Sequence, residues 1–210
     1  MASRLGDQTA RLEGRISLNP MRHIDLIGTL IYPALMIFGP LIGFGGSGIV
    51  FGWGKPTPVI TRNLQKITRD DNIITLAGPA ANLLLVLVAF LTLALIAVAI
   101  PGGRAAVDIT THGLILPEGL SAPQAVALLA WLMVEVNLAL FFFNFLPIPP
   151  LDASRFVRNI LPYNALNTFD TIGRFGFVII FILGRIVVGI FLGPALAVVH
   201  AGLAPFLGAG

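Results

Sequence analysis

One carboxylate, Asp152, follows a proline-rich break at the end of a long apolar stretch. Pro147, Pro149 and Pro150 each fix their own φ and push the preceding residue out of the helical region, so a helix must stop here. Asp152 is therefore placed at the end of a helix and not along its side. An acid in this place fits two roles, a ligand for a metal ion or the N-cap of a short following helix at 152–160. Spacing alone favours neither role.

Amide side chains on two predicted helices accompany this acid. Asn137 and Asn144 are seven residues apart and share one helical face. On the preceding apolar helix, Thr75, Gly78 and Asn82 share another face. Each amide alone is equally well explained as a hydrogen-bonding contact between helices. Placing polar side chains inside a bilayer costs free energy, however. Since three amides and a carboxylate are expected to converge at one depth, we favour a functional site over contacts between helices.

The elements that carry these residues are expected to lie in a membrane. Of the 210 residues, 56% are hydrophobic and 11% are charged, and the mean hydropathy is +0.91, unlike a soluble globular domain. Several uncharged stretches reach the roughly 20 apolar residues that a helix needs to cross a bilayer. We predict three full transmembrane helices, at 72–100, 122–146 and 175–193, and a shorter C-terminal helix at 195–207. The fold class is an all-α polytopic membrane protein, with one membrane-embedded domain over residues 1–210.

Three details of this fold are predicted from local signals. Gly193 and Pro194 are expected to end the third helix. The alternation in RLEGRISLNP, within residues 1–23, predicts a short β-strand or β-hairpin at the membrane surface. Residues 24–50 run into a stretch with seven glycines between Gly39 and Gly54, which favours a re-entrant segment that enters the membrane and returns. A glycine-rich but ordinary span is the alternative.

The distribution of basic residues predicts the orientation in the membrane. Arg and Lys number four in residues 1–23, four in 51–71, one in 101–121 and three in 147–174. A re-entrant first segment puts eleven of these on one face and one on the other, and cytoplasmic loops carry such an excess. We therefore expect the N-terminal segment and the loops 51–71 and 147–174 to be cytoplasmic. This topology also explains the sequence pI near 10 without a nucleic-acid partner, and the absence of cysteine excludes disulfides and thiolate metal sites.

Four stretches together resemble the site-2 protease family of intramembrane zinc metalloproteases, in its compact bacterial branch without a PDZ domain. The similarity runs over most of residues 4–160, and the combination is specific although each stretch alone is weak evidence. The resemblance implies a protein of the bacterial inner membrane. The four stretches are GRISLNPMRHID at 14–25, FGWGKPTPV at 51–59, AGPAAN at 77–82 and NLALFFFNFLPIPPLDASR at 137–155.

The resemblance assigns roles to residues of this chain. In the family, a helix with H-E-x-x-H supplies two zinc ligands and a glutamate base, and the acid of an L-D-G motif supplies the third ligand. Asp152 corresponds to that acid, while Asn82, Asn137 and Asn144 would line the site or position the substrate. A membrane-dipping hairpin or loop would bind an unwound transmembrane peptide as an added strand. Its residues would be Phe51, Gly52, Trp53, Lys55 and Pro56.

Two departures from the family pattern matter. The glycine of L-D-G is Ala153 here, which is strained if that position needs φ > 0. The H-E-x-x-H motif, with its general-base glutamate, is absent from the sequence. The first residues, MASRLGDQTARLEGR, resemble the stretch that follows the second histidine in the family, so we expect a start site placed too far downstream, or a truncated gene, in preference to a catalytically dead relative. The complete protein would bind one zinc ion, and this chain alone none, because a lone Asp does not hold zinc.

The remaining titratable residues offer no substitute for the missing ligands. His23, His112 and His200 are the only histidines, none at ligand spacing, and the predicted topology separates His112 from Asp152 across the membrane. We interpret His23 as a surface or supporting residue. Glu135 and Arg185 are each the only charge within a predicted span, so we expect them to face each other or to share a watery cavity.

Three functions of different classes follow. The leading one is an intramembrane zinc endopeptidase that cleaves transmembrane peptide segments within the lipid bilayer, inactive in the form of this chain. The second is a pseudoprotease that binds such segments without cutting them. The third is a small transporter, which would also need a broken helix and intramembrane charges.

Overall fold

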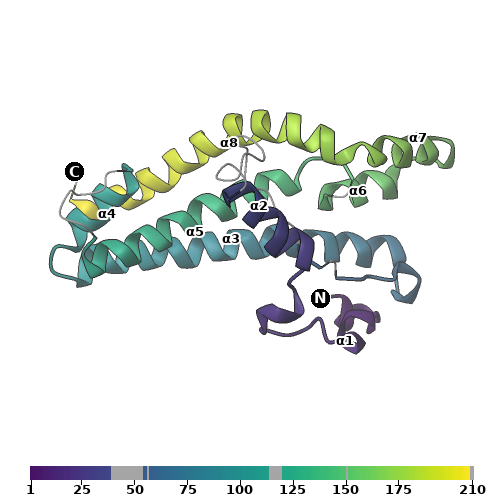
Figure 1. The fold of residues 1–210 in the computed structure, drawn as a ribbon, viewed down its shortest axis with the longest axis horizontal. Helices are drawn as coiled ribbons and strands as arrows, with labels where there is room; N and C mark the ends of the chain where they lie inside the picture. Colours follow the sequence, from purple (N-terminus) through teal and green to yellow (C-terminus); the bar gives the residue numbers. More distant parts are fainter. Residues whose placement is uncertain (39–53, 56, 114–119, 150, 209–210) are drawn as a thin grey trace. The chain divides into compact units, whose positions relative to one another are not determined.

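The computed structural model describes residues 1–38, 54–55, 57–113, 120–149 and 151–208, apart from the side chains of residue 36 and of several residues between 177 and 188 (Figure 1). Over these residues the regular structure is helical. The α-helices are α1 (Thr9–Leu12), α2 (Tyr32–Phe38), α3 (Ile67–Ala99), α4 (Gly103–Thr111), α5 (Ala122–Asn144), α6 (Asp152–Ile160), α7 (Tyr163–Arg174) and α8 (Gly176–Leu207). The chain divides into two compact units, Met1–Asp71 and Asn72–Gly210.

The N-terminal unit begins with helical turns where a β-hairpin was predicted. Its first 23 residues form a 3-10 turn at Ala2–Leu5, helix α1 and a second 3-10 turn at Pro20–Arg22, and no strand is found in the described part of the chain. The β-hairpin prediction is therefore wrong. Asn19 shows the physical reason, because its side chain accepts a hydrogen bond from the Met21 N–H at 3.0 Å and Pro20 follows it at the first helical position. Such local bonds offer the backbone an alternative to strand pairing.

Residues 26–38 form one continuous apolar helical segment, a π-helical stretch at Leu26–Ile31 followed by α2. Asp25 caps its start, since one carboxylate oxygen accepts hydrogen bonds from the N–H groups of Ile27 and Gly28. The glycine-rich residues 39–53 lie outside the described residues, so the re-entry of 24–50 stays a prediction.

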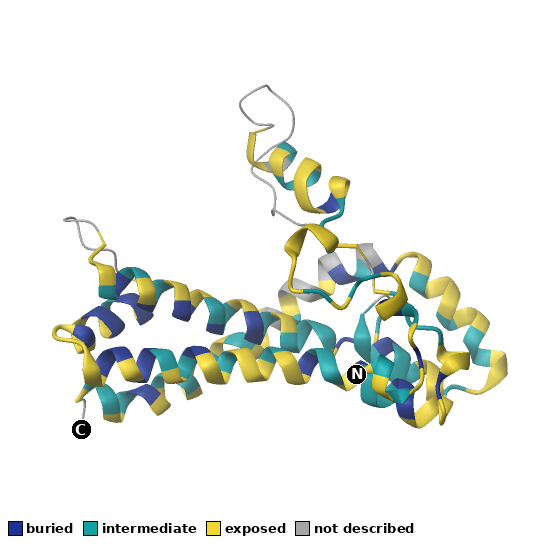
Figure 2. Ribbon diagram, turned by 90° about the horizontal axis from the view of Figure 1, so that it is seen from below, coloured by how far each residue is buried: buried dark blue, intermediate teal, exposed yellow. Residues whose placement is uncertain are grey.

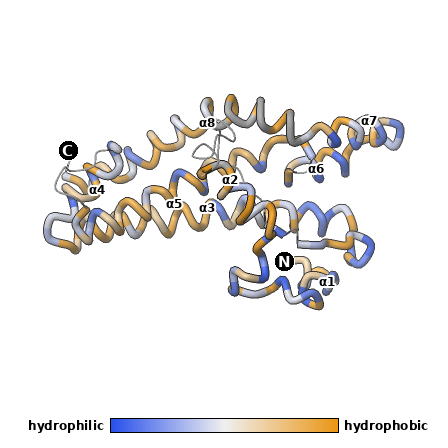
Figure 3. Tube along the Cα trace, in the orientation of Figure 1, coloured by the Kyte–Doolittle hydropathy of each residue, from blue (hydrophilic) through white to orange (hydrophobic). Residues whose placement is uncertain are grey.

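The second unit is built on long apolar helices. Among the described residues, three helical segments are long and apolar enough to cross a membrane, namely α3, α5 and the Gly189–Leu207 part of α8. This agrees with an all-helical membrane protein. Hydrophobic residues run along α3 and α5, while hydrophilic ones concentrate around α6 and α7 (Figure 3). Many large apolar side chains on these helices are exposed, as expected of surfaces that face lipid.

Helix α8 continues past Pro194, where the sequence predicted its end. It runs unbroken through Pro194 and Pro205 to Gly208, which ends it in the left-handed conformation at φ +80°. The prediction that Gly193 and Pro194 separate a third span from a short tail helix is therefore wrong. A proline removes one backbone hydrogen bond from a helix. In a membrane no water is available to the other backbone N–H and C=O groups, so these groups stay hydrogen-bonded within the helix and the helix continues.

The core of the second unit lies where α3, α4, α5 and α8 meet. Its buried residues lie on the facing sides of the long helices (Figure 2). Leu93, Val107, Val134 and Leu203 are fully buried and come one from each of these four helices. Helix α4 packs against both α5 and α8 at one end of the unit, whereas α6 and α7 lie at the other end (Figure 1).

Replacing Ser121 by alanine is expected to lower the free energy of unfolding by about 1 kcal/mol. Ser121 and Gln124 form a capping box at the start of α5, in which the Ser121 Oγ accepts from the Gln124 N–H and the Gln124 Oε1 accepts from the Ser121 N–H at 3.0 Å. Denaturant unfolding in detergent micelles, followed by circular dichroism, measures the loss. Ser121→Asn keeps a cap acceptor and should lose much less; equal losses would contradict the capping role.

Candidate functional site

The predicted proline break is present at the end of α5. The helix ends at Asn144, and α6 begins at Asp152 after an extended Leu151 with φ −71° and ψ 156°. Leu151 is the N-cap of α6, and no side-chain hydrogen bond caps this helix. Asp152 stands one position later, in the first turn, so the N-cap role weighed for it is not seen in the structure.

Helix α3 approaches the Asp152 carboxylate through a glycine. A Cβ atom added to Gly78 would lie 2.7 Å from Asp152 Oδ2, closer than a carbon and an oxygen can stand without displacement. The absence of a side chain at Gly78 is what allows this approach. The Gly-Pro-containing stretch 77–82 and Asp152, which are far apart in the sequence, therefore meet in space.

A small cavity lies beside the same carboxylate. Its volume is about 30 Å³, and it is bounded by α3, by the end of α5 and by the start of α6. The cavity brings together Asp152, Asn144 and Thr75, whose hydroxyl is buried and has no hydrogen-bond partner among the described residues. The lining residues are Thr75, Leu76, Pro79, Asn144, Phe145, Asp152, Ala153 and Phe156.

The other two amides are placed differently. Asn137 is 8% exposed, and its amide nitrogen donates a hydrogen bond to the Met133 carbonyl of its own helix at 2.8 Å. Asn82 is half-buried and is not among the cavity-lining residues. Of the three amides, the structure brings Asn144 to Asp152.

The environment of Asp152 disfavours its charge. Burial raises the pKa of the Asp152 carboxyl above its usual value, and the Arg155 guanidinium, one turn along α6, opposes this only in part. A carboxylate in such a place is stabilised by a bound cation or a hydrogen-bond donor. The site is thus chemically suited to a positive or hydrogen-bonding ligand.

Comparison with known proteins finds a similar protein. The "Putative zinc metalloprotease YwhC" of Bacillus subtilis (strain 168) is 29% identical over 183 residues, which cover 87% of this chain and 70% of that protein. This similarity, over most of the chain, supports the resemblance to the site-2 protease family. No family model matches the chain, and no solved structure matches it.

The acid motif of the site-2 protease pattern is accommodated here without strain. Ala153, which replaces the glycine of the site-2 protease pattern, lies within α6, and the described residues include no residue other than glycine with positive φ. The strain that an alanine would suffer in a left-handed conformation therefore does not arise.

The stretch that the site-2 protease resemblance assigns to substrate binding is only partly described. Phe51, Gly52, Trp53 and Pro56 lie outside the described residues. Lys55 is exposed, and its N–H donates to the His23 carbonyl at 2.9 Å.

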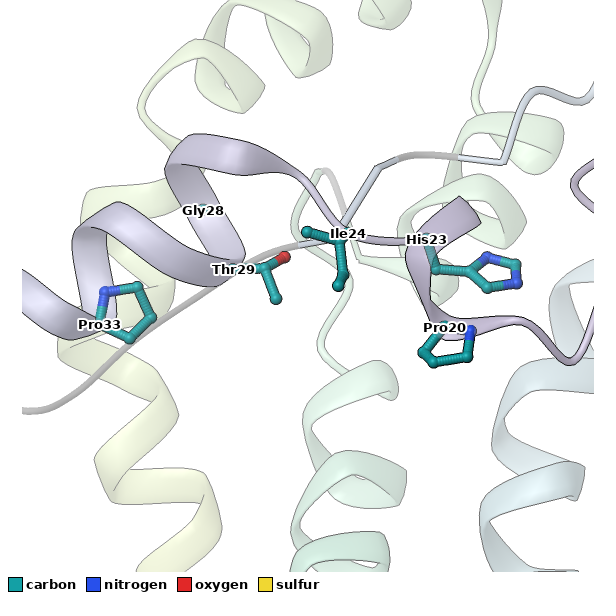
Figure 4. Close-up of a pocket in the computed structure, with 7 residues that line it drawn as sticks. Pro20, His23, Ile24, Gly28, Thr29 and Pro33 are labelled. Carbon is teal, nitrogen blue, oxygen red and sulfur yellow. The ribbon is translucent and has the colours of Figure 1, made fainter.

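An open pocket of about 560 Å³ lies in the N-terminal unit, beside His23. Its walls follow the chain from Pro20 to Pro33, and the imidazole of His23 extends past Pro20 at one end (Figure 4). The His23 Nε2 is hydrogen-bonded to the Ser17 carbonyl at 2.8 Å. The histidine thus takes part in the packing of this unit, in keeping with a supporting role.

The structure brings together two histidines that the sequence analysis treated as isolated. The rings of His112 and His200 have centroids 5.5 Å apart, and the His200 ring packs edge-on to Trp131 at 4.7 Å. His112 is the C-cap of α4, and His200 lies in α8; helix α4 lies at the opposite end of the second unit from α6 (Figure 1). No local sequence signal predicts this contact between residues 88 positions apart. The Arg185 side chain lies outside the described residues, so its pairing with Glu135 stays a prediction.

The residues around Asp152 do not fit a zinc ion by themselves. A catalytic zinc site needs three protein ligands, and the described part of the chain contains no group of three or more His, Cys, Asp or Glu side chains arranged to hold a metal. Among the described residues that line the cavity, Asp152 supplies one carboxylate, beside one amide and one hydroxyl.

Proposed function

We propose that this protein acts as an intramembrane zinc metalloendopeptidase of the site-2 protease type, which cleaves membrane-embedded peptide segments and uses Asp152 as one zinc ligand. The observation that carries the proposal is the position of Asp152, held against Gly78 beside Asn144 at the break after an apolar helix. The similarity to a protein named as a zinc metalloprotease supports it. The ligands that complete the zinc site are not among the described residues near Asp152.

The chain's own residues have defined tasks in this proposal. The Asn144 amide donates a hydrogen bond to the carbonyl oxygen of the bound peptide and stabilises the charge that develops on it. The apolar Leu76, Phe145 and Phe156, which line the same cavity, limit the access of water and favour an apolar segment. Transmembrane segments of other proteins, within the lipid bilayer, are therefore the proposed substrates.

Zinc content and peptide cleavage test this function together. The full protein, purified in detergent, is expected to contain close to one zinc per chain by plasma mass spectrometry. It should cleave a fluorescent transmembrane peptide in proteoliposomes, and 1,10-phenanthroline should abolish the cleavage. A protein that neither binds zinc nor cleaves any of a panel of such peptides would contradict the proposal.

A pseudoprotease is the second candidate, favoured by the cavity lining, in which the described residues supply one carboxylate, one amide and one hydroxyl. It predicts that the same transmembrane peptide binds to the protein with no zinc present and remains intact. Crosslinking of the peptide, followed by mass spectrometry of its length, separates the two candidates.

We further propose that the protein resides in the bacterial inner membrane with residues 51–71 on the cytoplasmic side and 101–121 on the opposite side. The absence of native cysteine makes a direct test simple. In intact cells, a membrane-impermeant maleimide should label Arg104→Cys and leave Arg62→Cys unlabelled, since both arginines are exposed but lie on opposite faces of the proposed topology. Labelling of both variants would contradict this topology.

A further inference from the structure

Thr75 is the polar residue of the cavity that the family resemblance leaves without a role. It is 3% exposed, and its hydroxyl oxygen is fully buried without a hydrogen-bond partner among the described residues. Buried hydroxyl groups are nearly always hydrogen-bonded, because leaving one unpaired is costly. Thr75 lines the same cavity as Asp152, so the group that satisfies its hydroxyl is to be sought there.

The size of the cavity points to what that group is. A volume of about 30 Å³ holds one water molecule, since a buried water needs roughly 10–15 Å³ or more by this measure and two to four polar partners. Three polar side chains line this space, the Thr75 hydroxyl, the Asn144 amide and the Asp152 carboxylate. A carboxylate whose charge is disfavoured by burial gains from a water that donates to it.

We propose that this cavity is the binding site of one ordered water molecule, and that Thr75 positions the Asp152 carboxylate through it. The water donates a hydrogen bond to the carboxylate and is held in place by the Thr75 hydroxyl and the Asn144 amide. On the α3 side, the carboxylate lies directly against Gly78. The water and this contact together fix the orientation of the Asp152 carboxylate. The importance of this direction for catalysis rests on the proposed function, but the water site itself does not.

Thr75→Val removes the hydroxyl at constant shape and tests the inference. If the hydroxyl holds a water that bonds Asp152, the melting temperature should fall by about 3 °C, and in an Asp152→Ala background the same substitution should change it by less than about 1 °C. Thr75→Ser, which keeps the hydroxyl, should restore at least half of the loss. A Thr75→Val protein that melts at the same temperature as the original, or higher, would overturn the inference, because an unpaired hydroxyl costs stability.

A matched control comes from α4. Thr110 is also buried, but its hydroxyl donates to the Ala106 carbonyl at 2.7 Å within its own helix. Thr110→Val should therefore show the same change in melting temperature with and without Asp152. If Asp152→Ala altered the effect of Thr110→Val on the melting temperature as much as it altered the effect of Thr75→Val, then Asp152→Ala would act on the whole fold. That result would overturn a specific link between Thr75 and Asp152.

An experimental map at high resolution tests the water directly. A solvent peak is expected within about 3.2 Å of both the Thr75 Oγ1 and an Asp152 oxygen, and it should be missing in Thr75→Val. A direct bond between the two side chains with no solvent peak would overturn the water site. Neither the melting temperatures nor the map depend on peptidase activity. A negative result in these two tests would therefore contradict the water site and not the proposed function, whereas an absence of zinc or of cleavage would contradict the proposed function and not the water site.

Discussion

Replacing Asp152 by alanine is expected to lower both the zinc affinity and the zinc-dependent cleavage of a transmembrane peptide by at least about a hundredfold. Substitution of groups that merely support a metal ligand already costs about 10-fold to 100-fold, and Asp152 is proposed to be a ligand itself. The carboxylate lies against Gly78 and beside Asn144, and no other acid among the described residues lines this cavity.

The measurement pairs zinc titration with initial cleavage rates in proteoliposomes, in the full protein. Asp170→Ala is the matched control, because this carboxylate is exposed on α7 and forms an ion pair with Arg158 at 3.0 Å, outside the cavity. Exposed pairs contribute little, so the control should keep its zinc and its activity. If Asp152→Ala bound zinc as tightly as the control did, Asp152 would not be a ligand.

The long helices and the break between α5 and α6 could be predicted because their signals are local. Uncharged apolar stretches of sufficient length predict helices in a membrane, and the prolines at 147–150 predict the break by steric exclusion alone. Both features depend on neighbouring residues and not on the rest of the fold. The sequence analysis did not predict that α8 continues through Pro194. A proline costs one backbone hydrogen bond, and whether the helix continues depends on how the surroundings of the whole helix compare with that cost, which neighbouring residues alone do not show.

The arrangement of the site was less predictable than the helices. A shared helical face placed Asn137 and Asn144 together, yet the Asn137 amide bonds to the carbonyl one turn before it, and Asn144 lines the cavity. Helical periodicity gives the face of a side chain but not its hydrogen-bond partner. The contact of His112 with His200 had no sequence signal, since it depends on how α4 packs against α8.

Replacing Asp7 by alanine is expected to lower the stability of the N-terminal unit by about 3 kcal/mol, the largest effect on stability predicted here. Asp7 is completely buried. One oxygen accepts from the Asn63 amide and from both the N–H and the hydroxyl of Thr9, and the other accepts from the Ile60 N–H at 2.8 Å. The carboxylate thus joins the first turns of the chain to residues 60–63. Alanine would remove the buried acceptor that these four donor groups share.

The same hydrogen bonds predict how this stability depends on pH. The bond from the Thr9 hydroxyl, followed by those from Ile60 and Asn63, outweighs burial and lowers the pKa of Asp7 from 3.8 to about 2. Because the folded pKa lies below the unfolded one, the stabilisation is fully present above about pH 4 and is lost as the pH falls towards 2. Amide hydrogen exchange at Ile60 should therefore accelerate over this pH range, relative to the unstructured rate, in the original protein and not in Asp7→Asn.

Two variants separate the role of this carboxylate from a general effect of charge. Asp7→Asn keeps one acceptor oxygen and should lose only part of the stability, since an amide cannot accept from donors on both sides. Glu13→Ala removes an equal charge from the same unit, but Glu13 is exposed and its ion pair with Arg15 spans 3.7 Å, so its effect should stay below about 0.5 kcal/mol. If Glu13→Ala and Asp7→Ala were equally destabilising, net charge rather than the hydrogen bonds of the Asp7 carboxylate would hold residues 1–15 against residues 60–63.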